Sequence, residues 1–352
     1  MLRNRLIKSA LVVAAVLLAG GTGQAVSQTL TKLPITLNWK FYGVHGCLFL
    51  AQDKGYFAQQ GLEVTLDAGD GSANVVNRLA SGAYDIGFGD VGALVRFNVQ
   101  NPDKKVKAIY QDAPSDLSVV TLKSRGITKA KDLEGKTLGA PVGDAAFKMF
   151  PAFIAATKID AGSIKWEHMA ANLREAMLIQ GKVDAITANE QTAWSNLSTA
   201  GIKNEDMVFI RFSEQGVNLI NIGLMATDKI IRERPQVVRG VVAAVNRGYQ
   251  ECLANPEAAL DALLKRDPLL KRDVERTRFT MNVTRMLRSP DVKEGGLGVY
   301  GNRELQQSID VVVATEKLPG KPTPDDIATM QFLPPLAERT VPKPVLDKLL
   351  AQ

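Results

Sequence analysis

A helix–turn–strand unit that occurs twice limits the folds open to this 352-residue chain. The stretch Ser72–Asp90 is typical of an apolar helix ended by glycine, followed by a short apolar strand and then an acid. Leu173–Glu190 has the same order, with the glycine recurring after 99 residues and the acid after 100. Such units belong to α/β folds, and two of them predict two α/β lobes facing one another across a cleft. A cleft of this kind is a common place for a small-molecule site.

The N-terminus has the pattern of a secretory signal peptide. Arg3, Arg5 and Lys8 precede the uncharged run Ala10–Ala19, and small residues follow as far as Ser27. An apolar run of about ten residues is too short to span a bilayer. We therefore expect residues 1–27 to be removed, leaving a soluble exported protein without a membrane span.

Charge and composition argue against several classes of function. Without the three basic residues of the leader, 40 basic residues face 37 acidic ones, and no basic block interleaved with aromatics occurs, so nucleic-acid binding is not expected. His45 and His168 are the only histidines, and their spacing does not suit zinc. We expect no metal and no cofactor. Cys47 and Cys252 are the only cysteines, and their apolar neighbours favour buried thiols, with a disulfide as the alternative.

Several N-terminal segments resemble a known family of binding proteins. They are Leu37-Asn38-Trp39, His45-Gly46, Ala51-Gln52-Asp53-Lys54-Gly55-Tyr56-Phe57 and Gly61-Leu62-Glu63-Val64. Together they resemble the opening of the substrate-binding proteins of ABC importers for nitrate, sulfonate, taurine and thiamine-pyrimidine precursors. The resemblance continues through Leu79–Gly89 and Leu133–Pro141, and it extends from Ile35 to about Leu253.

The resemblance implies a two-lobed periplasmic binding protein, type II-like, in which each lobe is a mixed sheet flanked by helices. Residues 28–118 and 221–352 would form lobe 1 and residues 119–220 lobe 2, with crossings near Asp116–Thr121 and Gly216–Asn221. A monomer in the periplasm would close on a small ligand and deliver it to the permease and ATPase of an ABC importer. The export signal and the absence of a Ser/His/Asp, Cys/His or metal constellation, and not the resemblance, predict that it is not an enzyme.

Three acids are candidates for the ligand site. Asp90, Asp144 and Glu190 each stand where a strand ends or a helix begins. The alternative for each is a purely structural role, as a helix cap or in a solvated first turn. Arg174, near a helix start, is expected at the surface. If all three carboxylates reach the cleft, they suit a ligand with amino or cationic donors and disfavour a bare sulfonate or nitrate.

Aromatic residues and polar helix starts complete the candidate site. Trp39 at the end of the predicted strand Ile35–Trp39, Phe41 and Phe147 could stack on a planar ligand, with core packing as the alternative. Ser72 caps a helix whose free N–H groups could hold an anion, unless the segment is a plain tight turn. His45 stands where the thiamine-precursor members carry a histidine, with a core role as the alternative.

The first candidate ligand is therefore a nitrogen heterocycle, such as a pyrimidine precursor. Three other functions stay open. The chain could bind a sulfonate, taurine or nitrate anion, or it could resemble the pyrimidine-precursor synthases, in which His45 would matter. It could also be a ligand sensor that hands its closed form to a membrane receptor. The Phe41-Tyr42-Gly43-Val44 segment departs from the Thr-Pro-Asn-Thr usual in the thiamine-precursor members, so the resemblance does not identify the ligand.

Overall fold

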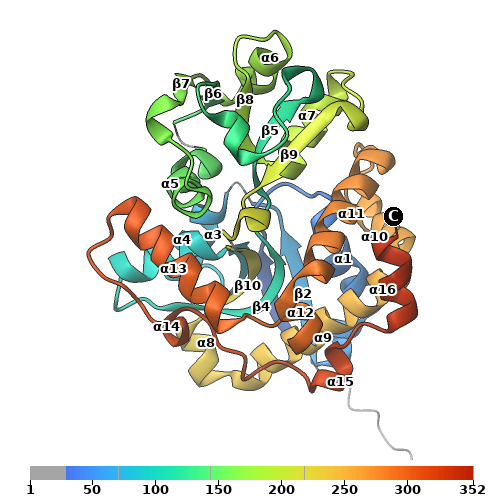
Figure 1. Cartoon of the computed structure of the whole chain (residues 1–352). Coiled ribbons are helices and arrows are strands. Elements are labelled where there is room, and N and C mark those ends of the chain that lie inside the picture. Colours follow the sequence, from blue (N-terminus) through green and yellow to red (C-terminus); the bar gives the residue numbers. More distant parts are fainter. Residues whose placement is uncertain (1–28, 70, 143, 218, 352) are drawn as a thin grey trace, which may run out of the picture. The chain divides into compact units, whose positions relative to one another are not determined.

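The strands of this protein form two five-stranded mixed sheets (Figure 1). The structure, a computed structural model, describes residues 29–69, 71–142, 144–217 and 219–351. The predicted leader, residues 1–27, lies outside the described residues.

The first sheet combines strands from the beginning and the middle of the chain. Its spatial order is β2 (Leu62–Asp67), β1 (Thr31–Thr36), β3 (Ile86–Asp90), β10 (Ile220–Thr227) and β4 (Val106–Pro114). β1 runs parallel to β2 and β3, whereas β10 is antiparallel to both β3 and β4.

The second sheet repeats this arrangement with the intervening strands. Its order is β7 (Lys165–His168), β6 (Thr137–Ala140), β8 (Ala185–Asn189), β5 (Leu117–Leu122) and β9 (Met207–Arg211). β6 is parallel to β7 and β8, and β5 is antiparallel to β8 and β9. The two copies of the sequence repeat therefore supply equivalent strands, β3 and β8.

Helices cover both faces of each sheet, which explains why the inner strands β3 and β8 are buried along nearly their whole length. The α-helices are α1 (Gly46–Asp53), α2 (Tyr56–Gln59), α3 (Ser72–Ala80), α4 (Val91–Gln100), α5 (Ala145–Thr157), α6 (Arg174–Ile179), α7 (Glu190–Thr199), α8 (Asp228–Glu233), α9 (Pro235–Ala254), α10 (Pro256–Arg266), α11 (Arg272–Arg288), α12 (Pro290–Gly295), α13 (Asn302–Glu316), α14 (Pro324–Ile327), α15 (Leu336–Arg339) and α16 (Lys343–Leu350). The 3₁₀ turns are η1 (Gly43–His45), η2 (Lys123–Arg125), η3 (Ala130–Leu133), η4 (Ala161–Ser163), η5 (Ala171–Leu173), η6 (Asn204–Asp206) and η7 (Ser213–Gln215). None of the helices in the described part of the chain is long and apolar enough to cross a bilayer.

The hydrophobic core is divided by the sheets. On one face of the first sheet, strand residues such as Ile35 and Phe88 pack with α1, α9, α10 and α11, and on the other face Met225 packs with α3, α4 and α13. The second sheet packs against α5 on one face and against α6 and α7 on the other. Both sheets are thus rigid platforms whose strand ends can position a site.

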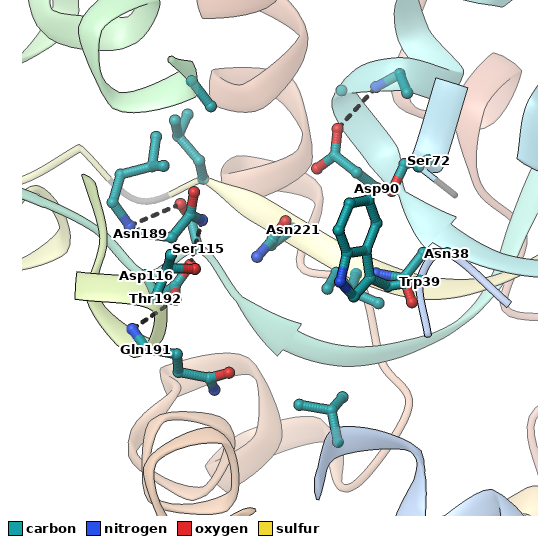
Figure 2. A pocket seen from close by; sticks show the side chains of 18 of the residues that line it. Asn38, Trp39, Ser72, Asp90, Ser115, Asp116, Asn189, Gln191, Thr192 and Asn221 are labelled. Atoms are coloured by element: carbon teal, nitrogen blue, oxygen red, sulfur yellow. Dashed lines mark hydrogen bonds between the residues drawn. The ribbon is translucent and has the colours of Figure 1, made fainter. Parts of the chain in front are cut away.

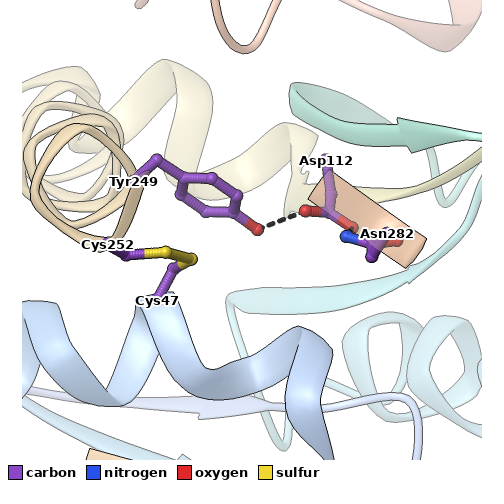
Figure 3. The surroundings of a disulfide bond; sticks show 5 residues. All are labelled: Cys47, Asp112, Tyr249, Cys252 and Asn282. Atoms are coloured by element: carbon purple, nitrogen blue, oxygen red, sulfur yellow. Dashed lines mark hydrogen bonds between the residues drawn. A yellow bond between two sulfur atoms is a disulfide. The ribbon is translucent and has the colours of Figure 1, made fainter. Parts of the chain in front are cut away.

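A disulfide joins α1 to α9, so the expectation of free thiols is wrong. Cys47 and Cys252 are bonded, with their Cα atoms 5.4 Å apart (Figure 3). The helices approach closely because α9 has Gly248 at the contact, where a Cβ would lie 2.7 Å from the Cys47 carbonyl oxygen. The two cysteines are 205 residues apart in sequence, and nothing local to either one indicates this helix contact.

The chain crosses between the sheets twice, from β4 to β5 and from β9 to β10. The crossings run side by side, because the Ser115 N–H donates to the Leu219 carbonyl at 2.7 Å. They overlap the expected crossings, Asp116–Thr121 and Gly216–Asn221, only in part, because Leu117 already begins β5 and Ile220 begins β10. The division into lobes at residues 118 and 221 stays a prediction.

Two element ends differ from the sequence-based expectations. β1 ends at Thr36, so Trp39 lies in the bend beyond the strand and not at its end. Gly71, and not Ser72, caps α3, because its positive φ of 137° produces the turn that leads into the helix.

Candidate functional site

A cavity of about 890 Å³ lies where the ends of the two sheets meet at the crossings. We call it the cleft cavity. Trp39, Ser72 and Asp90 line it from the elements of the first sheet, and Asn189 and Gln191 from those of the second (Figure 2). Its volume suits a small organic ligand.

Trp39 presents an exposed indole ring to this cavity. The bend that carries it is held by backbone hydrogen bonds, from Gly69 N to the Trp39 carbonyl at 3.0 Å and from Gly71 N to the Asn38 carbonyl at 2.7 Å. Gly69 is required for this approach, since a Cβ there would overlap the Leu37 carbonyl oxygen. The bend leaves the side chain of Trp39 53% exposed, which is unusual for tryptophan and makes the ring available for stacking.

Asp90 ends β3 and lies beside Trp39 in Figure 2. Its Oδ1 accepts a hydrogen bond from Ala93 N at 2.8 Å and caps α4. Burial raises the pKa of Asp90 to about 6, although the Ala93 N–H and the Arg96 guanidinium favour the charged form. A carboxylate has more acceptor capacity than this cap uses, so Asp90 can both cap α4 and accept from a ligand.

Carboxamide side chains form much of the remaining wall. They are Asn38, Asn189, Gln191, Asn196, Asn221 and Asn282. In Figure 2, Asn221 lies between the Trp39–Asp90 side and the Asn189–Gln191 side. Asn38, Asn189, Gln191 and Asn282 already bond other protein groups. The donors and acceptors that these carboxamides have left match a ring edge with mixed donors and acceptors.

Asp116 is a cavity residue that the sequence reasoning assigned only to a crossing. It is buried and lines the cleft cavity. Its carboxylate accepts from Asn189 Nδ2 at 2.7 Å and from Gln191 N at 3.3 Å, and it lies 3.8 Å from Arg285 Nη1. Its position at a predicted crossing was the available signal, because small-molecule sites occur preferentially where two domains meet.

Asp144 does not line the cleft cavity, which corrects the expectation of three carboxylates there. Its Oδ1 accepts from Phe147 N at 2.9 Å and from Thr187 Oγ1 at 2.8 Å, and its Oδ2 accepts from Arg174 Nη1 at 3.0 Å. Arg174 is only 6% exposed and not at the surface as expected. A buried guanidinium must be paired, and Asp144 supplies that charge while capping α5.

Phe147 and Glu190 also lie away from the cleft cavity. The Phe147 ring is half-buried and packs edge-to-face on the partly buried Trp166, with centroids 4.7 Å apart. Glu190 is the first residue of α7 and accepts from Arg211 Nε at 2.6 Å and from Nη2 at 2.7 Å. It lines a different, smaller cavity.

His45 is a core residue in this structure. It is fully buried in η1, and its Nε2 lies 2.9 Å from Asn38 Oδ1. Burial lowers the pKa of His45 to about 3, so the ring is neutral at physiological pH. It does not line the cleft cavity but positions Asn38, which does.

Half of the predicted site residues therefore meet at one place. Trp39, Phe41, Ser72 and Asp90 line the cleft cavity, although the Phe41 ring also packs edge-on against Phe49. His45, Asp144, Phe147 and Glu190 do not line it. Among the described residues, no group of His, Cys, Asp and Glu side chains is arranged to hold a metal ion. Ligand binding by the four cavity residues stays a prediction.

Comparison with solved structures shows the fold. The protein is similar to the periplasmic aliphatic sulphonate binding protein SsuA of Escherichia coli, with a TM-score of 0.64 at 13% identity over 86% of this chain and 94% of that one. The arrangement of two mixed sheets flanked by helices is the periplasmic binding protein fold.

Comparison of sequences shows the family. The chain is 26% identical to the 4-amino-5-hydroxymethyl-2-methylpyrimidine phosphate synthase of Aspergillus parasiticus, over 70% of this chain and 74% of the relative. It is 23% identical to the formylaminopyrimidine-binding protein of Halalkalibacterium halodurans, over 81% of this chain and 84% of the relative. The model of the family described as NMT1/THI5 like matches residues 43–259. The chain therefore belongs to the NMT1/THI5-like family.

Proposed function

We propose that this protein is an extracytoplasmic solute-binding protein that captures a small nitrogen heterocycle and delivers it to an ABC importer. One observation carries the proposal: an exposed indole, Trp39, stands beside the carboxylate of Asp90 and across the cavity from the carboxamides of Asn189 and Gln191. A flat ring could stack on Trp39 while an exocyclic amino group donates to Asp90 and ring nitrogens meet the carboxamides.

The charges of the cleft cavity favour such a ring over a small anion. The arginines that line it are already paired, Arg96 with Glu316, Arg278 with Glu275 and Arg285 with Asp116. Lys40 and Lys148 also line the cavity, but both are exposed and therefore hydrated. A bare sulfonate or nitrate would have to leave water for a site whose arginines, all half-buried, are already paired with carboxylates.

The relatives and the predicted leader support the rest of the proposal. One relative is named for binding formylaminopyrimidine, which belongs to the same chemical class as the proposed ligand, the nitrogen heterocycles. The predicted signal peptide and the Cys47–Cys252 disulfide agree with export to an oxidising compartment such as the periplasm. Export and a ligand cavity between two sheets are what delivery to a membrane importer requires.

An enzymatic function is the second candidate, because a relative is named as a pyrimidine phosphate synthase. His45, which would matter in such an enzyme, is buried, neutral and outside the cleft cavity. The geometry therefore supports binding without conversion. A sensor that presents its closed form to a receptor would use the same cavity.

Ligand capture would involve closure about the two crossings. The cleft cavity takes residues from both sheets, so a ligand that contacts Trp39 and Asn189 together can do so fully only when the halves are close. Small-angle scattering should show a more compact particle with saturating ligand, and an unchanged radius of gyration would contradict the proposal.

A thermal-shift screen tests the ligand class. Nitrogen heterocycles, sulfonates and carboxylates are added to the mature protein, and binding raises the melting temperature by mass action. We expect heterocycles to give the largest shifts and Trp39→Ala to abolish them. Trp194→Ala is the matched control, because the indole of Trp194 bonds Asn204 outside the cleft cavity. Shifts from taurine or nitrate alone would overturn the proposed ligand.

Mass spectrometry of the bound heterocycle separates binding from catalysis. The ligand that gives the largest shift is incubated with the protein and recovered. We expect it to return unchanged, and turnover to a new mass would favour the enzyme instead.

A further inference from the structure

A second cavity, of about 430 Å³, lies next to the crossings, and we call it the hinge cavity. It shares Ser115, Asp116, Leu219, Ile220 and Arg285 with the cleft cavity. The rest of its lining is its own and comes from β4, β9, η7, α11, α12 and the start of α13. The crossing segments therefore form the wall between the two cavities.

The hinge cavity has an apolar floor. Pro114, Leu219, Ile220, Met281 and Pro290 line it. This surface could bury the short hydrocarbon part of a small ligand, and removing that apolar part from water is favourable.

A buried acceptor in the same lining lacks a partner. Gln111 is 2% exposed, and its Oε1 makes no hydrogen bond. Its backbone is held by a bond from Gln111 N to the Gly298 carbonyl at 2.9 Å, so the side chain stays at the cavity wall. A buried carbonyl oxygen without a donor is unusual in a folded protein, and a donor supplied by a ligand would satisfy it.

Two acids in the lining lie together, Asp291 and Glu304, and the exposed Arg303, outside the lining, approaches Glu304 with its Nε 3.8 Å from Oε1. Asp291 accepts from Gly301 N at 3.1 Å and lies against Glu304. Gly301 is required here, because a Cβ would overlap the Asp291 carboxylate. Burial, and then the charge of Glu304, raise the pKa of Asp291 to about 6.

The remaining acids of the hinge cavity are already neutralised. Glu190 and Glu214 both pair with Arg211, and Asp116 lies 3.8 Å from Arg285. The guanidinium of Arg288 is exposed to water. Arg303 is an exposed and distant partner of Glu304, so the carboxyl pair can still take a positive charge, and Gln111 can take a hydrogen-bond donor.

We propose that the hinge cavity binds a small organic ammonium ion that also carries a hydroxyl group. An ammonium group has three donors and no acceptor, which matches Asp291, Glu304 and Gln111 Oε1. The oxygen of the hydroxyl group accepts a hydrogen bond from Arg285 Nε, a buried donor that also lacks a partner. The hydrocarbon between the two groups lies on the apolar floor.

Occupancy of the hinge cavity acts on the cleft cavity. Gln111 and α11 belong to the first-sheet side of the crossings, whereas Glu190 and Arg211 belong to the second. The proposed polar contacts are all on the first-sheet side, but the hydrocarbon part lies on Leu219 and Ile220, which line both cavities, so occupancy is linked to the affinity for the cleft ligand.

Calorimetric titration of the mature protein with 5-aminopentanol tests the proposal, with 1,5-pentanediol and pentylamine as matched probes. We expect 5-aminopentanol to bind more tightly than pentylamine and the diol not to bind. Asp291→Asn should weaken 5-aminopentanol at least tenfold, because it removes the charge and keeps an acceptor for Gly301 N.

Two further variants separate the cavities. Trp39→Ala should leave 5-aminopentanol binding unchanged, since Trp39 lines only the cleft cavity. Glu304→Gln is the second test of the carboxyl pair if Asp291→Asn does not fold. The hinge site would be overturned if the diol bound as tightly as 5-aminopentanol. It would also be overturned if Trp39→Ala lost 5-aminopentanol binding while the two carboxyl variants kept it. Neither result would bear on the proposed function.

Discussion

The two copies of the helix–strand repeat use their acids differently. In the first copy β3 ends at Asp90, which caps α4 and lines the cleft cavity. In the second copy β8 ends at Asn189, which lines the cleft cavity in the same way, and Glu190 follows as the first residue of α7. Glu190 faces Arg211 and the hinge cavity.

The difference is one residue of register. The glycines that end the preceding helices are 99 residues apart, and the strands β3 and β8 are also offset by 99. Asp90 therefore corresponds to Asn189. The acid of the second copy, Glu190, lies 100 residues after Asp90 and so one residue beyond the matching position. Because successive helix residues are rotated by about 100°, that step turns the carboxylate to another side. The cleft thus pairs a carboxylate on one side with a carboxamide on the other.

Removing Asp144 should have the largest effect, on stability and not on affinity. Asp144→Ala leaves the buried Arg174 with only Glu175 and removes the cap of α5. We expect a loss of about 3 kcal/mol in the free energy of unfolding, measured by urea denaturation. Affinity for the heterocycle should change less than twofold. A tenfold loss of affinity in the folded variant would show that Asp144 belongs to the ligand site after all.

Asp90→Ala should have the next largest effect, on affinity. A charge-assisted hydrogen bond to the ligand is worth about 1.5–3 kcal/mol, which corresponds to tenfold to over a hundredfold in Kd by calorimetry. Asn189→Ala at the matching position should cost less, about 0.5–1.5 kcal/mol, because the lost group is neutral. Equal losses in the two variants would remove the asymmetry that we infer between the two sides of the cleft.

Because the pKa of Asp90 is raised on folding, the stability of the protein should depend on pH through this residue. The amide of Asn189, at the matching position, does not titrate and makes no such contribution. The folded state holds the proton up to about pH 6, whereas the unfolded chain releases it near pH 4. The free energy of unfolding should therefore fall as pH rises from 4 to 6, by up to about 2 kcal/mol from this group. Asp90→Asn should flatten this part of the profile in urea denaturation. An unchanged slope would show that Asp90 is solvated like an ordinary carboxylate.

Glu190→Gln should have the smallest effect. Arg211 is 39% exposed and keeps Glu214 as a partner, so the lost pairing should cost less than about 1 kcal/mol of stability. Affinity in the cleft should stay within twofold of the wild type. Loss of binding comparable to that in Asp90→Ala would show that Glu190 reaches the ligand and that the register argument is wrong.

The order of the elements and the fold were determined by the sequence. Glycine punctuation, apolar strands and the repeat after 99 residues are local patterns, and each reports on backbone conformation and burial within a few residues. The N-terminal motifs indicated Trp39 as a site residue, and it lines the cleft cavity, although it lies in the bend beyond β1 and not at the end of a strand. Asp90 followed from the same logic, because the end of an inner strand in such a sheet borders the ligand cavity.

Only the tertiary structure decided which charged groups are free to meet a ligand. Asp144 has its partner 30 residues away in Arg174, Glu190 has Arg211 across the second sheet, and Cys47 has Cys252 at a separation of 205 residues. An acid at a helix start looks the same in sequence whether it faces a cavity or a buried guanidinium. Pairing is decided by distances between segments that the chain brings together only when it folds, and a carboxylate neutralised in this way has little left to offer a ligand.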